Sequence, residues 1–147
     1  MSVRARAVIP DGDGRVLFDH THHPDKSPFY WLPGGGVEPG ETAEEAVQRE
    51  LVEEASLEIA VERLLYLSEN LFVESGEYRH EVILYFLAGA GRTLPGAPTD
   101  LRRHEWHPPA ATPGPFLPPD VAAAVVHDLA DGFRRPVLHL VTDERPA

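Results

Sequence analysis

Residues 31–57, WLPGGGVEPGETAEEAVQRELVEEASL, constrain the fold of this chain more than any other part of it. Three consecutive glycines follow a proline, which predicts a loop whose backbone can approach another group closely. Thr42, followed three residues later by Glu45, is a capping box and predicts a helix from about Ala43 to Ala55. The chain must therefore fold so that a glycine-lined loop lies beside the start of an acidic helix.

Carboxylates fall on the face of this helix that its periodicity assigns to the core. At about 100° per residue, Glu50 and Glu54 share one stripe with the apolar residues, and Glu53 lies at its edge. The apolar members of that stripe are Ala43, Ala46, Val47 and Leu51. The simpler interpretation of a glutamate-rich helix is a solvated face, and the periodicity argues against it. Like charges at this spacing destabilise a helix by roughly a few tenths of a kcal/mol per pair, and burial adds to that unless a cation neutralises them.

This arrangement predicts a metal site made of oxygen ligands. Carboxylates select hard cations, so we expect Mg²⁺ or Mn²⁺ at Glu50, Glu53 and Glu54. Arg49 is expected to balance part of the charge and hold a carboxylate in place. In the preceding loop, Gly35 and Gly36 are the candidate substrate-binding positions; no Gly-Lys-Ser/Thr follows them, which excludes a nucleoside-triphosphatase phosphate loop.

Composition narrows the class of protein. The 147 residues suit one domain, 1–147, and no apolar run approaches the ~18 residues of a membrane span, so no membrane partner is expected. The net charge of −11 disfavours a nucleic-acid polymer as partner and requires a cation between the protein and a phosphorylated substrate. The absence of cysteine excludes disulfides, thiolate metal sites and cysteine nucleophiles, and a cytoplasmic location is the default expectation.

The rest of the chain predicts strands and a second helix. Strands are expected over residues 3–9, 15–19, 29–32, 57–73 (as one or two), 80–88 and 101–107, a helix over 121–131, and a small strand or a tail at 137–141. The first two strands should form a hairpin about the turn at 11–14, while residues 20–28 and 89–98 should be loops and 108–119 an irregular proline-rich connection. The apolar run at 82–86 indicates a strand covered on both faces. The fold class is α+β or an α/β/α sandwich, a mixed sheet with helices on its faces.

Residues 35–57 resemble the box of the Nudix hydrolase family, of the MutT type. That box reads Gly, five residues, Glu, seven residues, Arg-Glu, an aliphatic, any residue, Glu-Glu, any residue, Gly and an aliphatic. In register, this chain supplies Gly35, Glu41, Arg49, Glu50, Leu51, Glu53, Glu54 and Leu57. Ser56 replaces the glycine that ends the helix in the family, at a place that favours positive φ. A serine there costs about 1 kcal/mol if φ is positive, so a slightly altered helix end is expected rather than a dead site.

The resemblance implies roles for the residues of the box. It implies a Nudix fold in which Glu53 and Glu54 bind metal, with the carbonyl of Gly34 as a further ligand. Glu50 would bind metal or act as the general base.

The resemblance also implies two supporting contacts. Glu41 and Arg49 would pair and brace the loop against the helix. A further acidic ligand from outside the box is common in such sites, and Asp100 is the first candidate for it, ahead of Glu105 and Glu81.

The implied function is that of a Mg²⁺-dependent pyrophosphohydrolase. Its substrate would be a nucleoside diphosphate linked to another moiety, or a nucleoside triphosphate, and a homodimer would be in keeping with the family. The alternative is a catalytically weak or inactive Nudix-fold domain that binds nucleotides as a sensor. An isopentenyl diphosphate isomerase on a similar fold would need a cysteine in its site, which this chain lacks.

Overall fold

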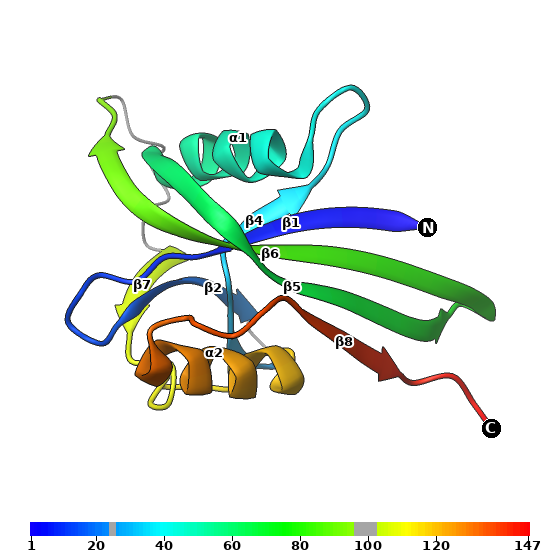
Figure 1. Ribbon diagram of the computed structural model, residues 1–147. Helices are drawn as coiled ribbons and strands as arrows, with labels where there is room; N and C mark the ends of the chain where they lie inside the picture. The colour runs from blue at the N-terminus through cyan, green and yellow to red at the C-terminus, as the bar shows by residue number, and fades with distance from the viewer. Residues whose placement is uncertain (24–25, 96–102) are drawn as a thin grey trace.

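The structure, a computed structural model, describes residues 1–23, 26–95 and 103–147, with residues 21–23 and 26–28 described as backbone only. Two helices lie on opposite sides of a layer of strands, α1 above it and α2 below it in Figure 1. The helices are α1 (Ala43–Ala55) and α2 (Pro119–Asp131), and the strands are β1 (Ser2–Val8), β2 (Val16–His23), β3 (Lys26–Trp31), β4 (Gly34–Gly36), β5 (Leu57–Glu74), β6 (Glu77–Thr93), β7 (His104–His107) and β8 (Leu138–Asp143).

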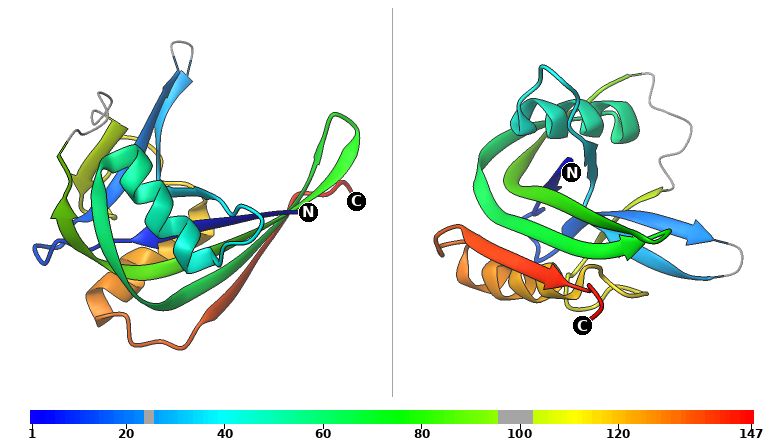
Figure 2. Two further views of the ribbon diagram at one scale, coloured as in Figure 1. Left: turned by 90° about the horizontal axis from the view of Figure 1, so that it is seen from above. Right: turned by 90° about the vertical axis from the view of Figure 1, so that its right-hand side faces the viewer.

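The strands form two sheets. The larger has the order β4-β1-β6-β5-β8 and is mixed, because β1 runs parallel to β6 and β8 parallel to β5, whereas the other pairs are antiparallel. The smaller has the order β3-β2-β7 and is antiparallel throughout. Figure 2 shows the β5–β6 hairpin extending well beyond both helices. The predicted α+β class, a mixed sheet flanked by helices, is confirmed.

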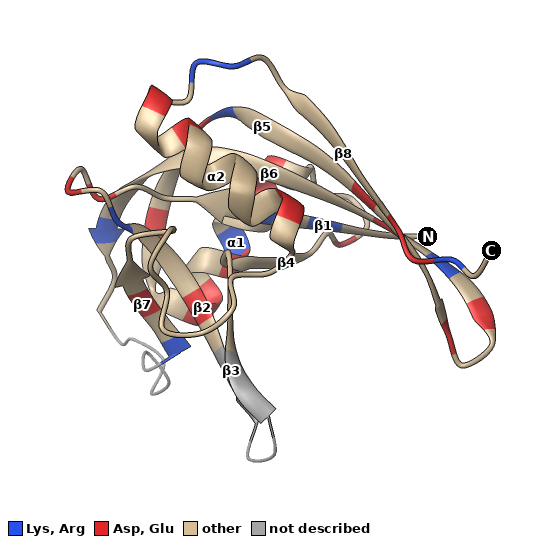
Figure 3. Ribbon diagram, turned by 90° about the horizontal axis from the view of Figure 1, so that it is seen from below, with Lys and Arg blue, Asp and Glu red and all other residues tan. Residues whose placement is uncertain are grey.

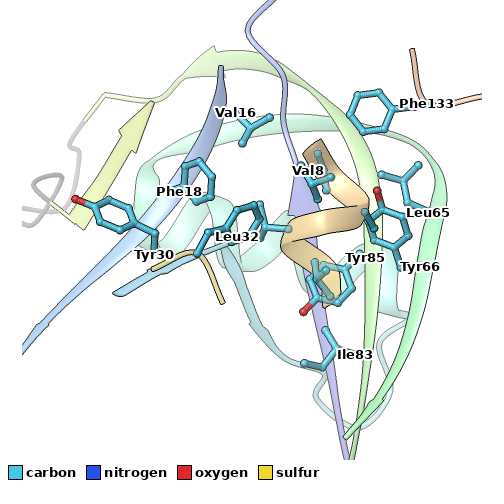
Figure 4. Close-up of a cluster of buried hydrophobic side chains, with 14 residues drawn as sticks. Val8, Val16, Phe18, Tyr30, Leu32, Leu65, Tyr66, Ile83, Tyr85 and Phe133 are labelled. Atoms are coloured by element: carbon cyan, nitrogen blue, oxygen red, sulfur yellow. The ribbon is translucent and has the colours of Figure 1, made fainter. Parts of the chain in front are cut away.

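The larger sheet buries apolar side chains on both of its faces. On one face, Phe86 of β6 packs with Ala46, Val47 and Leu51 of α1. On the other face, Tyr85 belongs to the core between the sheet and α2, and Figure 4 shows the side chains of this core. Neighbouring residues of β6 thus point into different cores, which confirms that the apolar run is covered on both sides.

The buried carboxylate of Asp128 joins α2 to the larger sheet through Tyr66 of β5. The carboxylate of Asp128 accepts hydrogen bonds from the hydroxyl of Tyr66 at 2.7 Å and from Nε of Arg135 at 2.6 Å. Burial alone would raise the pKa of Asp128, but these hydrogen bonds hold it below its ordinary value. Further acidic positions lie toward both ends of α2 (Figure 3), and Asp128 is the buried one.

Near the N-terminus, two sequence predictions are wrong and a third is only partly confirmed. Residues 20–23 and 26–28, expected as loop, belong to β2 and β3. The expected hairpin about the turn at 11–14 is present only next to the turn, where Asp11 N–H donates to the carbonyl of Arg15 at 3.0 Å and Leu17 N–H to that of Ile9 at 3.1 Å. Beyond it, β1 pairs with β4 and β6, and β2 enters the other sheet. Gly34–Gly36, expected as loop, is the short strand β4, because its register with residues 4–6 of β1 supplies backbone partners that no sequence pattern reveals.

Later elements follow the sequence more closely. Residues 57–73 form one long strand, β5, with three register shifts. The small terminal strand is present as β8, and α2 ends at Gly132 as expected. Residues 89–93 extend β6 instead of starting a loop, and residues 96–98 lie outside the described part of the chain. Among the described residues, no helix has the length and apolar character needed to cross a membrane.

The end of α1 is a left-handed cap formed by serine. Ser56 has φ 49° and ψ 36°, and its backbone N–H donates to the carbonyls of Leu51 and Val52. Serine therefore takes the conformation that favours glycine, so the helix end is kept and the cost appears as backbone strain.

Replacing this serine with glycine is expected to stabilise the fold. Ser56→Gly should raise the free energy of unfolding by about 1 kcal/mol, because glycine has no Cβ to strain at positive φ. The measurement is urea denaturation, with the slope checked for constancy. Ser56→Ala is the control, since it removes the hydroxyl and keeps the Cβ. An equal gain from both variants would mean that the hydroxyl, and not the backbone, causes the effect.

Candidate functional site

Arg49 connects the loop before α1 to the carboxylates of α1. Its Nε and Nη2 atoms donate to the two oxygens of Glu41 at 3.1 and 2.7 Å, and Nη2 also donates to the carbonyl of Gly36 at 3.0 Å. Its Nη1 atom donates to Glu50 at 3.2 Å and to Glu53 at 3.1 Å. The hydrogen bonds raise the pKa of Arg49 and lower that of Glu41, so both groups are charged at neutral pH. The expected Glu41–Arg49 pair is present.

The carboxylate of Glu50 fills the space that a side chain at Gly35 would need. A Cβ placed on Gly35 would lie 2.5 Å from the carboxyl carbon of Glu50, closer than atoms can approach. At Gly36, by contrast, nothing lies within 4 Å of such a Cβ. A side chain at Gly35 would thus displace the carboxylate of Glu50, whose side chain is only 14% exposed.

Two residues from the smaller sheet meet Glu54. Asp19 of β2 and His104 of β7 are direct cross-strand partners, so their side chains project from the same face of that sheet. One ligand atom of each and one of Glu54 all lie within 4.8 Å of one another. Asp19 is buried, and the guanidinium of Arg103 lies 3.8 Å from its Oδ1 atom.

Crowding of these acids changes the proton affinity of Glu54. Burial, a hydrogen bond with Glu50 and the charges of Glu50 and Asp19 raise the pKa of Glu54 to about 7, against an ordinary value of 4.5, while Arg103 partly offsets the shift. The charge on Glu54 is therefore only partly compensated within the protein, whereas Glu53, whose side chain is 57% exposed, extends from the edge of the helix and contacts Arg49.

The structure brings some of the predicted site residues together and leaves others apart. Glu50 and Glu54 lie together, and Glu53 and Glu50 both accept from Arg49. Gly34 of β4 lies opposite Arg6 of β1 in the sheet. Asp100 lies outside the described residues.

Neither of the two other candidates for an acidic ligand outside the box joins the cluster. Glu105 binds His20 and His107, and Glu81 pairs with Arg4.

Sequence reasoning missed Asp19 and His104. Alternation along residues 15–19 identifies which side chains share a face, and His104 shares a face with Trp106 two residues later. Only the pairing of β2 with β7, and the position of that sheet under α1, reveals that both reach Glu54.

Two cavities share Arg6, Trp31 and Glu81 in their linings. One, of about 360 Å³, has Asp19 in its lining, and the other, of about 320 Å³, includes Phe72 and Tyr85. Arg6 donates to the carbonyl of Leu32 at 2.7 Å and lies 6.0 Å from the centre of the Trp31 ring. Asp19 and Phe72 therefore line different cavities that have the cation Arg6 in common.

Known proteins match this chain in sequence and in fold. A model of the NUDIX domain matches residues 1–127. The 8-oxo-dGDP phosphatase NUDT18 of Homo sapiens is 32% identical over 110 residues, which are 75% of this chain and 32% of that protein. The RNA pyrophosphohydrolase of Dinoroseobacter shibae is 44% identical over 63 residues, 43% of this chain and 38% of that protein. The chain spans about a third of the length of these curated relatives.

A solved structure shares the fold. The NUDIX hydrolase from Nitrosomonas europaea has a TM-score of 0.70 to this chain, with 21% identity and 92% of each chain covered. At that identity the likeness shows the arrangement of strands and helices, which agrees with the two sheets and two helices described above.

The raised pKa of Glu54 predicts a stability that depends on pH. Because its pKa in the folded chain is about 7 and its ordinary value is 4.5, Glu54 favours folding below about pH 4.5, and this contribution is lost as the pH rises through 7. In metal-free protein, Glu54→Gln should therefore raise Tm at about pH 8 and leave it near that of the wild type at about pH 4.5. Thermal melts with a chelator present measure both.

Glu62→Gln is the matched control for that experiment, since it removes an exposed carboxylate of β5 outside the cluster. A gain from Glu54→Gln that is the same at both pH values, or no larger than that of Glu62→Gln, would contradict the pH dependence.

Proposed function

Because the chain belongs to the NUDIX domain family, we propose that it hydrolyses a diphosphate linkage in a small phosphorylated molecule, with a divalent metal ion bound beside α1. The proposed substrate is a nucleoside diphosphate linked to another moiety or a nucleoside triphosphate, and the proposed ion is Mg²⁺ or Mn²⁺. One observation carries most weight: Glu50 is packed against Gly35 and held by Arg49, next to Glu54, whose pKa is raised by burial and by the neighbouring carboxylates.

The residues present fit a hard divalent cation. Glu50, Glu53 and Glu54 offer only oxygen, and Glu54 meets the charges of Glu50 and Asp19 with only a partial offset from Arg103, so a cation would relieve the repulsion. We assign these three side chains and the carbonyl of Gly34 to the ion. When bound, the ion activates a water molecule and neutralises charge that develops on the phosphate oxygens.

The chain's own groups orient this site. Arg49 fixes Glu50 and Glu53 in relation to the loop, and Glu41 fixes Arg49 with two hydrogen bonds. Glu50 either ligates the ion or takes the proton from the attacking water. Gly35 and Gly36 keep the loop free of side chains where the phosphates pass, since Gly36 faces open space.

The two cavities favour a nucleotide over a simple diphosphate. The cavity lined by Asp19 and Arg6 lies nearest the acidic cluster and suits the phosphates, with Arg6 as the cation. The second cavity offers the aromatic side chains of Trp31 and Phe72, on which a base packs favourably, and the buried Tyr85 also belongs to its lining. The names of the curated relatives, an 8-oxo-dGDP phosphatase and an RNA pyrophosphohydrolase, support phosphorylated nucleosides as the class.

Three further predictions belong to this proposal. They are a single NUDIX domain over residues 1–147, a homodimer, and a cytoplasmic location.

A substrate panel tests the proposed hydrolysis. Nucleoside triphosphates, 8-oxo-dGDP, nucleoside diphosphate sugars and a 5′-triphosphorylated RNA oligonucleotide are incubated with Mg²⁺ or Mn²⁺, and products are identified by mass spectrometry. At least one small nucleotide should be cleaved, and Glu53→Gln and Glu54→Gln should each lower kcat/KM by about 10²-fold or more. Binding of a nucleotide without any product would favour the sensor alternative instead.

The packing of Glu50 against Gly35 gives a sharper test. Gly35→Ala places a methyl group where the Glu50 carboxylate lies, so the carboxylate must move and activity should fall by about 10²-fold. Gly36→Ala adds the same methyl group one residue later, into open space, so it leaves the Glu50 carboxylate in place. It should keep kcat near that of the wild type, and any effect at this substrate-binding position should appear in KM alone. Steady-state kinetics on the best substrate of the panel measures both. Equal losses of kcat in the two variants would show that activity depends on the loop backbone and not on the position of Glu50.

A further inference from the structure

Asp19, Glu54 and His104 form a cluster that the box does not contain. Two of its members come from the smaller sheet and one from the helix that packs on the larger sheet. Because Asp19 and His104 are directly paired across β2 and β7, the backbone itself fixes their separation and direction. Their ligand atoms and that of Glu54 lie within 4.8 Å of one another, a spacing that one ion between them can satisfy with small side-chain movements.

Asp19 points to a cation at this place. The residue is only 9% exposed, and its Oδ1 atom accepts no hydrogen bond within the described part of the chain. A buried carboxylate oxygen without such a partner is costly, so a charged ligand is expected to compensate it. Arg103, at 3.8 Å, is too distant to hydrogen-bond, and its side chain is 52% exposed, so it can move aside.

The donor atoms set the kind of ion. Two carboxylates and one imidazole make a mixed oxygen and nitrogen set, whereas the Glu50 and Glu53 side of the site offers oxygen alone. Nitrogen ligands favour first-row transition ions over Mg²⁺, which prefers oxygen. Glu54 lies between the two sets, because it contacts Glu50 on one side and Asp19 and His104 on the other.

We propose that Asp19, Glu54 and His104 form a second divalent-cation site, which selects a transition ion such as Mn²⁺ over Mg²⁺ and shares Glu54 with the site of the box. That the second ion serves hydrolysis rests on the proposed function; that it binds does not.

Manganese itself is the probe for this site. Mn²⁺ is added to the full chain in a large excess of Mg²⁺, free Mn²⁺ is counted by electron paramagnetic resonance, and pulsed spectra report nitrogen bonded directly to the ion. The wild type should retain bound Mn²⁺ with a directly coordinated ¹⁴N. His104→Asn should abolish the nitrogen signal and weaken binding at this site by at least about tenfold, and Asp19→Asn should weaken binding on the same scale.

His107→Asn is the matched control, since it changes a histidine of the same strand whose ring contacts Glu105 and not the cluster. It should leave both the nitrogen signal and the affinity unchanged, with circular dichroism confirming that every variant is folded. If His104→Asn does not fold, Asp19→Asn and the wild-type spectrum still decide the question. Bound Mn²⁺ without coordinated nitrogen, or a signal that persists in His104→Asn, overturns the inference and leaves the proposed function standing. Coordinated nitrogen in a protein that cleaves nothing in the panel overturns the proposed function alone.

Discussion

The arrangement of the carboxylates on α1 depends on the hydrogen bonds made by the guanidinium of Arg49. It donates to Glu41 and Gly36 of the loop and to Glu50 and Glu53 of the helix, so one charged group fixes both segments. A lysine there would supply the charge but not the planar set of donors. The loop and the helix thus act as one rigid piece, and the position of Glu50 against Gly35 follows from it.

Charge on the inner side of α1 is left only partly balanced. Arg49 neutralises the outer carboxylates, while Glu54 and Asp19 meet where the helix faces the smaller sheet. The core beneath α1 supplies the apolar contacts that keep the helix in place despite this repulsion. Such partial compensation is typical of sites that bind cations, because full compensation within the protein would remove the reason for the ion to bind.

Local patterns predicted what depends on local geometry. The capping box at Thr42 and Glu45, the buried stripe of α1 and the doubly covered run of β6 follow from periodicity and hydrogen bonding within a few residues. The strand partners did not follow, because β2 leaves the turn to join β3 and β7, and residues 34–36 become a strand only through β1. The box residues of the candidate site were found from spacing alone, because they lie in one loop and the helix that follows it. Asp19 and His104 were not, since what brings them together is the register between distant strands.

Asp128 and Glu54 lie on opposite sides of the larger sheet, and their surroundings shift their proton affinities in opposite directions. The pKa of Asp128 lies below 3.8, so its contribution to stability is present at neutral pH and is lost as the pH falls through that lowered value. Acid therefore acts on the two layers with opposite sign. It relieves repulsion under α1 while it removes the charge that ties α2 to Tyr66 and Arg135. Acid denaturation of this fold would accordingly start at the layer farther from the acidic cluster.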